Sequence, residues 1–369
     1  MEKIKGLDGI RAIAVILVII SHLGFYPKLT ELGLWTPSLL PVFSGLAGVH
    51  IFFVLSGFLI THLLVTEHAN KGRVSLRDFY IRRALRILPL YLLVVTLVGI
   101  MELAGEAGTR PVSFLYAYTF TFNMMPKEHY SAILGHTWSL AVEEHFYLVW
   151  PLLFSLFFLR RKALLFVVCS AVVAVSIWLQ VVIEPLRTHY FVERWSLPAG
   201  SSISIGALAA LLLSATRQRG LNGALAGSGA LLLSGVLYFH GLLIGELPWG
   251  ASGQLRALGV ALLLLWIFAN QGSGLVRVLE FRPLAYIGAI SYGLYMWQGF
   301  FLSTGPGRSA SQTWPPDSAT GLVLLLLVAP LSYHAFEKPF LRLKGRFSHR
   351  AEKKAFISQM DSIQQQRTL

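Results

Sequence analysis

Residues 7–26 predict the first helix: Leu-Asp-Gly-Ile-Arg-Ala-Ile-Ala-Val-Ile-Leu-Val-Ile-Ile-Ser-His-Leu-Gly-Phe-Tyr. Basic residues precede this stretch, and the apolar run from Ala12 to Ile20 matches the pattern of a secretory signal. However, no small-x-small cleavage site follows the run. The stretch therefore predicts an uncleaved first transmembrane helix over about residues 9–26.

The composition of the 369-residue chain excludes a soluble protein with a single core. Hydrophobic residues make up 55% of the chain and charged residues 13%, against roughly 25% charged in an ordinary soluble domain. The mean hydropathy is +0.62. The apolar stretches are long and numerous enough to build one membrane domain.

Ten stretches approach the roughly 20 residues that cross the hydrocarbon layer of a bilayer. They lie at about 9–26, 41–65, 87–105, 137–159, 163–183, 197–215, 221–244, 254–270, 284–303 and 319–336. The segment near 112–125 is shorter and rich in Tyr, Thr and Asn, so we expect it to be re-entrant or interfacial. The sequence thus predicts an all-α polytopic membrane protein with about ten transmembrane helices.

The distribution of basic residues predicts the orientation in the membrane. The net charge is +13, but the basic clusters do not alternate with aromatic residues as a nucleic-acid-binding face would, so no nucleic acid is expected as a partner. Lys and Arg concentrate in cytoplasmic loops. When Arg11 is counted with the N-terminus, the two termini and the connections 66–86, 160–162, 216–220 and 271–283 hold 24 of the 31 Lys and Arg. We expect both termini in the cytoplasm, with a transmembrane domain over 1–340 and a basic, polar tail over 341–369.

Three ionisable residues mark one helix as a functional candidate. Asp8, Arg11 and His22 occur in the first predicted span, where charged groups are costly unless they face a wet interior. Arg11 and His22 share a helical face and stand about 16 Å apart along the axis. They are expected at opposite ends of one substrate channel. The alternative is an interfacial anchor Arg and a His that only packs between helices.

A second polar cluster opens the span at 137–159. His136, Ser139, Glu143 and Tyr147 fall on one helical face, whereas Glu144 points elsewhere. Glu143 is therefore the better candidate for an interior carboxylate, either with a catalytic role or paired with an Arg that holds two helices together.

Arginines precede the third span. Arg83 and Arg86 are three residues apart, a spacing at which two guanidinium groups can grip a polyphosphate. The positive-inside rule alone is the other explanation for these arginines and for Arg82.

Several kinds of site lack support in the sequence. The His residues in or near apolar runs show no HxxxH or HExxH spacing, so no metal is expected. Cys169 is the single cysteine and has no charged neighbour in the sequence, so we expect no acyl-enzyme on it.

Six stretches, in order through nearly the whole chain, resemble the acyltransferase-3 family of integral-membrane O-acyltransferases. They are Leu7–Val15 with His22, Phe52–Thr61, Arg82–Pro89, His136–Glu144, Ser291–Tyr295 and Glu337–Pro339. The resemblance puts the family's Arg-x10-His pattern on Arg11 and His22. It puts the arginine pair on Arg83 and Arg86, and the Trp-Ser-Leu-x-Val-Glu pattern on residues 138–143.

The resemblance implies an enzyme of the bacterial cytoplasmic (inner) membrane. Such an enzyme moves an acyl group, usually acetyl, from cytoplasmic acyl-CoA to a hydroxyl of a glycan, a lipid-linked sugar or a glycosylated small molecule such as a macrolide. Two departures matter, because His50 stands where an acid is expected and Gln298 stands where members often have His. Some members also carry a fused esterase-like domain; we expect none here, because the chain ends too soon for one.

The residues and the resemblance together predict a mechanism. His22 is expected to act as the general base on the acceptor hydroxyl, with Glu143 as a second catalytic residue. Acetyl-CoA, or another short acyl-CoA, is expected as the donor. Four arginines are expected to bind its phosphates: Arg11, Arg82, Arg83 and Arg86. The expected supporting residues are Asp8, His136, Trp138, Ser139 and Tyr147.

The alternative from another class is a transporter or flippase of a lipid-linked or glycosylated substrate. Release of free coenzyme A from an acyl-CoA separates the two classes. The sequence does not identify the acceptor, the length of the acyl group or the oligomeric state.

Overall fold

The computed structural model describes residues 4–24, 30–33, 39–158, 161–219, 227–247, 251–302 and 314–343. Within these ranges the chain is helical and forms no named strand, as predicted. The helices are α1 (Leu7–His22), α3 (Leu40–Phe43), α4 (Gly45–Lys71), α5 (Leu76–Leu103), α6 (Pro111–Tyr118), α7 (Thr137–Phe157), α8 (Lys162–Val182), α9 (Ser196–Arg219), α11 (Ser228–Ile244), α12 (Ala251–Ala269), α13 (Gly274–Leu279), α14 (Arg282–Ala289), α15 (Ser291–Phe301) and α16 (Ser318–Ser332).

Seven helical segments of the described chain are long and apolar enough to cross a membrane. They contain α4, α5, α7, α8, α9, α12 and α16. The other three predicted spans coincide with shorter helices, namely α1 with 16 residues, α11 with 17, and the pair α14 and α15. The total of ten spans therefore stays a prediction.

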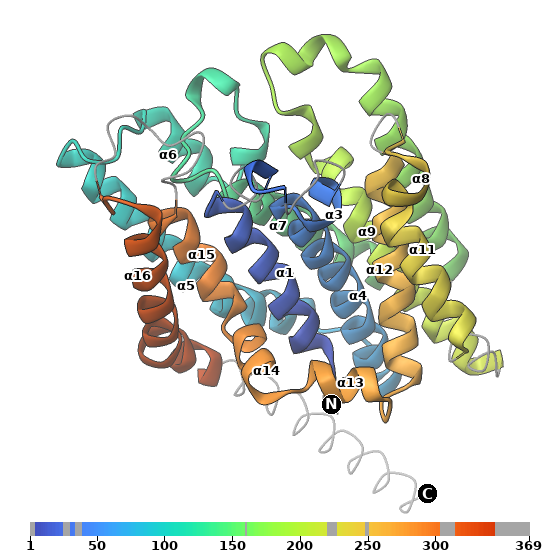
Figure 1. Ribbon diagram of the computed structural model, residues 1–369. Helices are drawn as coiled ribbons and strands as arrows, with labels where there is room; N and C mark the ends of the chain where they lie inside the picture. The colour runs from blue at the N-terminus through green and yellow to red at the C-terminus, as the bar shows by residue number, and fades with distance from the viewer. Residues whose placement is uncertain are drawn as a thin grey trace, which may run out of the picture.

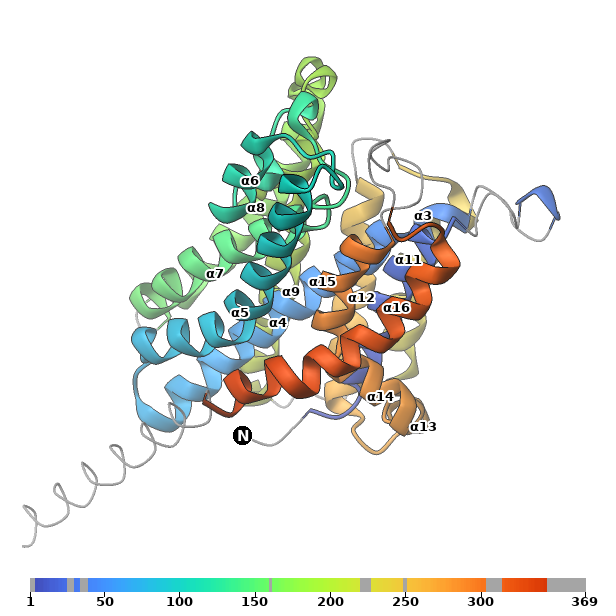
Figure 2. The same cartoon turned by 90° about the vertical axis from the view of Figure 1, so that its left-hand side faces the viewer.

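The helices form a bundle with two distinct ends (Figures 1 and 2). The start of α1, the end of α16, and the short helices α13 and α14 lie at one end, whereas α3 and α6 lie at the other. Helix α6 occupies the segment expected near 112–125, and its eight residues are too few to cross a bilayer. The predicted tail is described only up to Leu343, and the rest of it lies outside the described residues.

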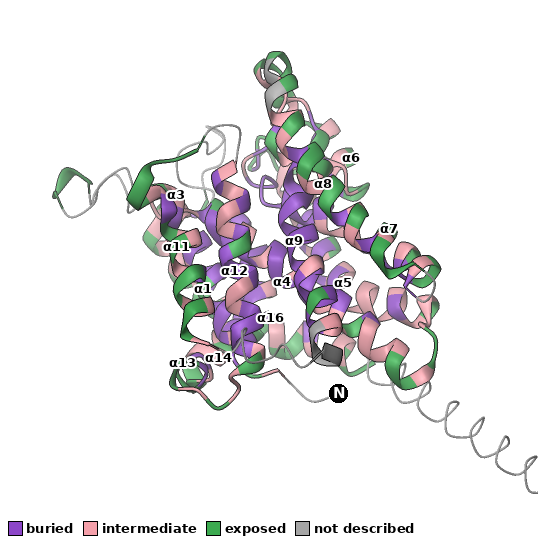
Figure 3. Cartoon of the chain, turned by 90° about the vertical axis from the view of Figure 1, so that its right-hand side faces the viewer, coloured by how far each residue is buried: buried purple, intermediate pink, exposed green. Residues whose placement is uncertain are grey.

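Helices α4 and α9 form the centre of the bundle. Figure 3 shows buried residues concentrated along α4, α9, α12 and α1. A Cβ on Gly57 of α4 would collide with the carbonyl oxygen of Ile203 in α9, so the two backbones are in direct contact there. Large apolar side chains such as Leu103 and Leu232 point outward, as expected for surfaces in lipid.

Helix α5 begins earlier than predicted. Ser75 caps it by accepting a hydrogen bond from the backbone N–H of Asp78, while Gly72, with a φ of 68°, ends α4 in the left-handed conformation. Arg83 and Arg86 therefore lie within a helix, not in the long loop 66–86 that was expected. Hydropathy places a boundary at the first charge, but arginine is a good helix former and these side chains face the protein interior.

The span predicted as one helix at 284–303 is two helices in the structure. The structure divides it at Ile290 into α14 and α15. Helix α14 packs across the start of α1, where Gly288 meets the backbone of Asp8. Hydropathy could not reveal this break, because the residues on both sides of it are apolar.

Candidate active site

An inner cavity of about 450 Å³ collects most of the predicted ionisable residues. Helices α1, α4, α5, α7 and α15 form its walls. Its polar lining consists of Asp8, Arg11, Ser56, His62, Arg83, Arg86, Ser139, Glu143, Ser291, Tyr292 and Tyr295. Residues from five helices, remote in sequence, thus surround a single space.

Glu143 is the centre of a network in this cavity. Its two carboxylate oxygens accept hydrogen bonds from Ser56 Oγ at 2.9 Å and from the Tyr147 hydroxyl at 2.7 Å. The Arg83 Nη2 atom lies 3.8 Å from the carboxylate, and its guanidinium carbon lies 3.6 Å from the centroid of the Tyr147 ring. This network fixes the orientation of Arg83 while leaving it on the cavity wall.

Arg11 and Arg86 line the same cavity from other helices. Arg11 pairs with Asp8 at 3.1 Å, one turn away on α1. Both arginines also line a side cavity of about 190 Å³ together with Asp8, Tyr292 and Glu337. Glu337 belongs to a π-helical turn, Tyr333–Glu337, and contributes a buried carboxylate beside the half-buried Arg86. Three guanidinium groups and their acidic partners thus occupy one region.

A second, outer cavity of about 430 Å³ contains His22, His136 and Trp138. His22 Nδ1 lies 2.8 Å from the carbonyl oxygen of Val18. A carbonyl can only accept, so in the neutral ring Nδ1 carries the proton and Nε2 keeps its lone pair. The ring is therefore oriented as a base whose free nitrogen is Nε2.

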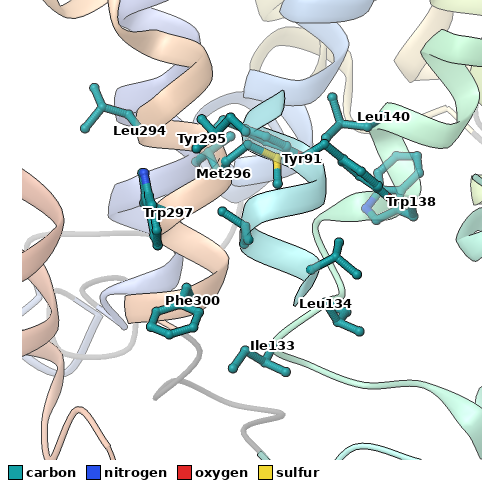
Figure 4. Close-up of a cluster of buried hydrophobic side chains, with 14 of the residues drawn as sticks. Tyr91, Ile133, Leu134, Trp138, Leu140, Leu294, Tyr295, Met296, Trp297 and Phe300 are labelled. Atoms are coloured by element: carbon teal, nitrogen blue, oxygen red, sulfur yellow. The ribbon is translucent and has the colours of Figure 1, made fainter. Parts of the chain in front are cut away.

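The two cavities meet at Val49 and Tyr295, which line both. The Tyr295 hydroxyl lies 2.6 Å from Ser139 Oγ and donates to the carbonyl oxygen of His136 at 3.1 Å. Figure 4 shows Tyr295 and Trp138 in the hydrophobic cluster between α15 and α7. The sequence predicted one channel from Arg11 to His22. The structure places these residues in two cavities that share the lining residues Val49 and Tyr295, and a continuous channel stays a prediction.

Two expected relationships are absent from this arrangement. Arg82 does not line the inner cavity, because its Nη2 atom pairs with Glu67 at 3.1 Å on the neighbouring helix. Glu143 and Asp8, expected to act with His22 as a second catalytic and a supporting residue, line the inner cavity, whereas His22 lines the outer one. Of the four residues predicted on one face of α7, Ser139, Glu143 and Tyr147 lie together, whereas His136 lines the outer cavity. Distance along α1 separates Asp8 from His22.

No role was predicted for Ser56, Tyr295 or Glu337, although each lies in a stretch that carries the family resemblance. The feature that could have pointed to Ser56 and Tyr295 is a polar side chain within an otherwise apolar stretch, and for Glu337 it is a carboxylate at the end of an apolar span. Their partners became visible only when α4, α7, α15 and α16 were brought together.

Comparison with known proteins identifies the family. The sequence model of an acyltransferase domain matches residues 4–334, nearly the whole chain. The chain belongs to the acyltransferase-3 family. The family resemblance inferred from the six stretches is thereby confirmed.

Relatives of this acyltransferase-3 chain carry related names. A peptidoglycan O-acetyltransferase of Listeria monocytogenes is 27% identical over 92% of this chain and 56% of its own length. A putative peptidoglycan O-acetyltransferase of Bacillus subtilis is 30% identical over 93% of this chain and 55% of its own. A putative O-acetyltransferase of Staphylococcus aureus is 26% identical over 92% and 58%.

This acyltransferase-3 chain thus spans slightly more than half the length of these relatives. No solved structure matches it.

Proposed function

We propose that the chain is an O-acyltransferase of the bacterial cytoplasmic membrane that moves an acyl group, acetyl in the simplest case, from acyl-CoA to a hydroxyl of a glycan. One observation carries the proposal. An arginine-lined cavity and a cavity containing an oriented histidine meet at Val49 and Tyr295. A donor in the first cavity and an acceptor in the second can react only at this shared wall.

The inner cavity suits the donor. Coenzyme A carries a diphosphate and a 3′-phosphate, and guanidinium groups bind such oxygens through paired, charge-assisted hydrogen bonds. Arg11, Arg83 and Arg86 provide three such groups at one cavity. Arg82 is paired with Glu67, so it contributes to the positive electrostatic potential on the cytoplasmic side and does not contact the donor.

The outer cavity suits the acceptor and the base. His22 Nε2 takes the proton of the acceptor hydroxyl as its oxygen attacks the thioester carbonyl carbon. The carbon–sulfur bond then breaks, and the coenzyme A thiolate leaves as the thiol with the proton that His22 had accepted, so the imidazole is neutral again. A new carbon–oxygen ester bond remains on the acceptor. Glu143 acts on the donor side, where it holds Arg83.

The relatives support the choice of acceptor class. Two carry names that specify peptidoglycan, which is a glycan rich in hydroxyl groups. A transporter or flippase is disfavoured by the family match over residues 4–334. Transport also gives no reason for an oriented imidazole beyond the arginine-lined cavity.

Substitution of His22 tests this function. In His22→Gln the side chain still hydrogen-bonds but cannot hold a proton, so acetyl transfer to soluble peptidoglycan fragments should fall about 10²–10⁴-fold. Binding of acetyl-CoA should stay near normal, because the arginines line the other cavity. Thiol release in nanodiscs measures the rate, and calorimetry measures the affinity.

His334→Gln is the matched control, since His334 is exposed and lines neither cavity. A His22→Gln enzyme as fast as this control would remove His22 as the base. If the wild-type protein releases no free coenzyme A, the acyltransferase function itself is wrong.

A further inference from the structure

Two buried amide side chains in the outer cavity have polar atoms that make no hydrogen bond to the described residues. Gln298 is 0% exposed, and neither its Nε2 nor its Oε1 makes a hydrogen bond within the described chain. Gln254 is 7% exposed; its Nε2 donates to Ser176 and Ser201, while its Oε1 has no partner among the described residues. Buried polar atoms without partners are costly, so these three atoms indicate a polar ligand in the cavity.

Arg194 adds a positive charge to the same cavity. Its guanidinium carbon lies 4.1 Å from the ring centroid of Phe191, 5.3 Å from that of Tyr130 and 5.5 Å from that of Trp138. These aromatic faces hold the group in place without neutralising its charge.

The other arginine of the cavity is already neutralised. Arg256 Nη1 contacts both carboxylate oxygens of Glu246, at 2.8 and 3.0 Å. Within the described ranges, by contrast, the Arg194 guanidinium has no carboxylate within 4.0 Å, although the exposed Glu193 precedes it and lines the same cavity. Arg194 is therefore the cation left to attract a ligand.

We propose that the outer cavity binds an anionic sugar, with Arg194 pairing with its carboxylate or phosphate and with Gln298 and Gln254 hydrogen-bonding its hydroxyl or amide groups. This inference rests on the proposed function, since it defines the acceptor of the same reaction. An amide side chain both donates and accepts, which matches sugar hydroxyl and acetamido groups. A planar guanidinium matches a carboxylate or phosphate.

The position of His22 fits this binding mode. Its ring lines the same cavity as Gln298 and Arg194, so a sugar held by these residues has its hydroxyl groups within the space that His22 faces. The departure from His to Gln at position 298 then acquires a role in binding. A neutral amide there is suited to holding a sugar, not to moving a proton.

Equilibrium binding tests the proposal without requiring catalysis. The probes are a neutral N-acetylglucosamine disaccharide, the same disaccharide with a carboxylate at C6, and its 1-phosphate. Each is titrated calorimetrically into the full chain in nanodiscs. At least one anionic probe should bind about tenfold or more tightly than the neutral one. Preference for the carboxylate indicates an acidic sugar, and preference for the phosphate indicates a lipid-linked sugar.

Variants assign the effect to the named residues. Arg194→Gln should abolish the preference for the anionic probe, whereas Arg194→Lys should retain part of it. Gln298→Leu should weaken all three probes by about tenfold. The control is Arg110→Gln, which removes an exposed arginine that does not line the cavity and should leave the preference unchanged.

The outcomes separate this inference from the proposed function. Equal affinities for the neutral and anionic probes, no binding of any probe, or a preference that survives in Arg194→Gln would overturn the anionic sugar site. Selective, Arg194-dependent binding without acetyl transfer would keep the site and refute the transferase. Acetyl transfer that is unaffected by Arg194→Gln would keep the transferase function and refute the anionic sugar site.

Discussion

Arg83 and Arg86 allow the contribution of a single side chain to the proposed donor binding to be measured. Each lines the inner cavity, and loss of one charge-assisted contact costs about 1.5–3 kcal/mol. We expect Arg83→Ala and Arg86→Ala each to weaken acetyl-CoA binding by that amount, measured by calorimetry in nanodiscs. Arg77→Ala is the control, because Arg77 lies on the same helix but is exposed and lines neither cavity. Affinities equal to that of the control would mean that Arg83 and Arg86 do not bind the donor and serve only the orientation of the chain in the membrane.

Glu143 and Glu144 are adjacent but should differ in effect. Glu143 contacts Ser56, Tyr147 and Arg83, whereas Glu144 lines neither cavity. Glu143→Gln should therefore reduce acetyl transfer by about tenfold or more, through loss of contacts to a charged group, and Glu144→Gln should reduce it less. Initial rates of thiol release make the comparison. Similar losses in both variants would refute the helical-face argument.

Helical periodicity was enough to predict which residues of one helix act together. It grouped Ser139, Glu143 and Tyr147, which the structure brings together, and separated Glu144 from them. His136, which was predicted on the same face, lines the outer cavity. It could not reveal that Arg11 and His22 line different cavities, because the dividing wall comes from other helices. Side chains contributed by one element are predictable from spacing, but a boundary built by several elements is not.

Contacts between helices make some glycines essential. A Cβ on Gly288 of α14 would collide with the backbone of Asp8 on α1. We expect Gly288→Ala to destabilise the protein by about 1–3 kcal/mol, as overpacking does, and to weaken acetyl-CoA binding because Asp8 holds Arg11. Thermal unfolding of the purified protein and calorimetry measure the two effects.

Gly272→Ala is the control for this substitution, since a Cβ there meets no atom within 4 Å. A Gly288→Ala protein with the melting temperature and donor affinity of this control would show that α14 shifts without cost. In that case, close packing of α14 would not be what positions Asp8.

The elements themselves were predictable to different degrees. Long apolar helices such as α7 and α8 begin and end near the residues expected from hydropathy. The early start of α5 and the break between α14 and α15 were missed, because both depend on charged or backbone groups that tertiary contacts stabilise. Hydropathy measures the preference of a segment for lipid, whereas these features concern the protein interior.

At the scale of the whole molecule, the two cavities lie toward opposite ends of α1, so the two ends of the bundle differ. The inner cavity, which we propose for the donor, includes residues near the start of α1, and the outer cavity includes His22 at its end. If the start of α1 faces the cytoplasm, acyl-CoA enters from the cytoplasm and the acceptor binds nearer the opposite surface. The orientation of the bundle therefore decides which compartment supplies each substrate.

Reporter fusions test this orientation. The start of α1 and the end of α16 lie at one end of the bundle (Figure 1), and 24 of the 31 Lys and Arg lie in the termini and connections expected on the cytoplasmic side. A reporter active only in the cytoplasm should therefore give a signal when fused after Leu369 or inserted at Gly272, and none when inserted in the 184–196 connection. An alkaline phosphatase reporter should give the opposite pattern. Equal signals at Leu369 and in the 184–196 connection would contradict the threading, and the arginine-lined cavity would then no longer be assigned to cytoplasmic acyl-CoA.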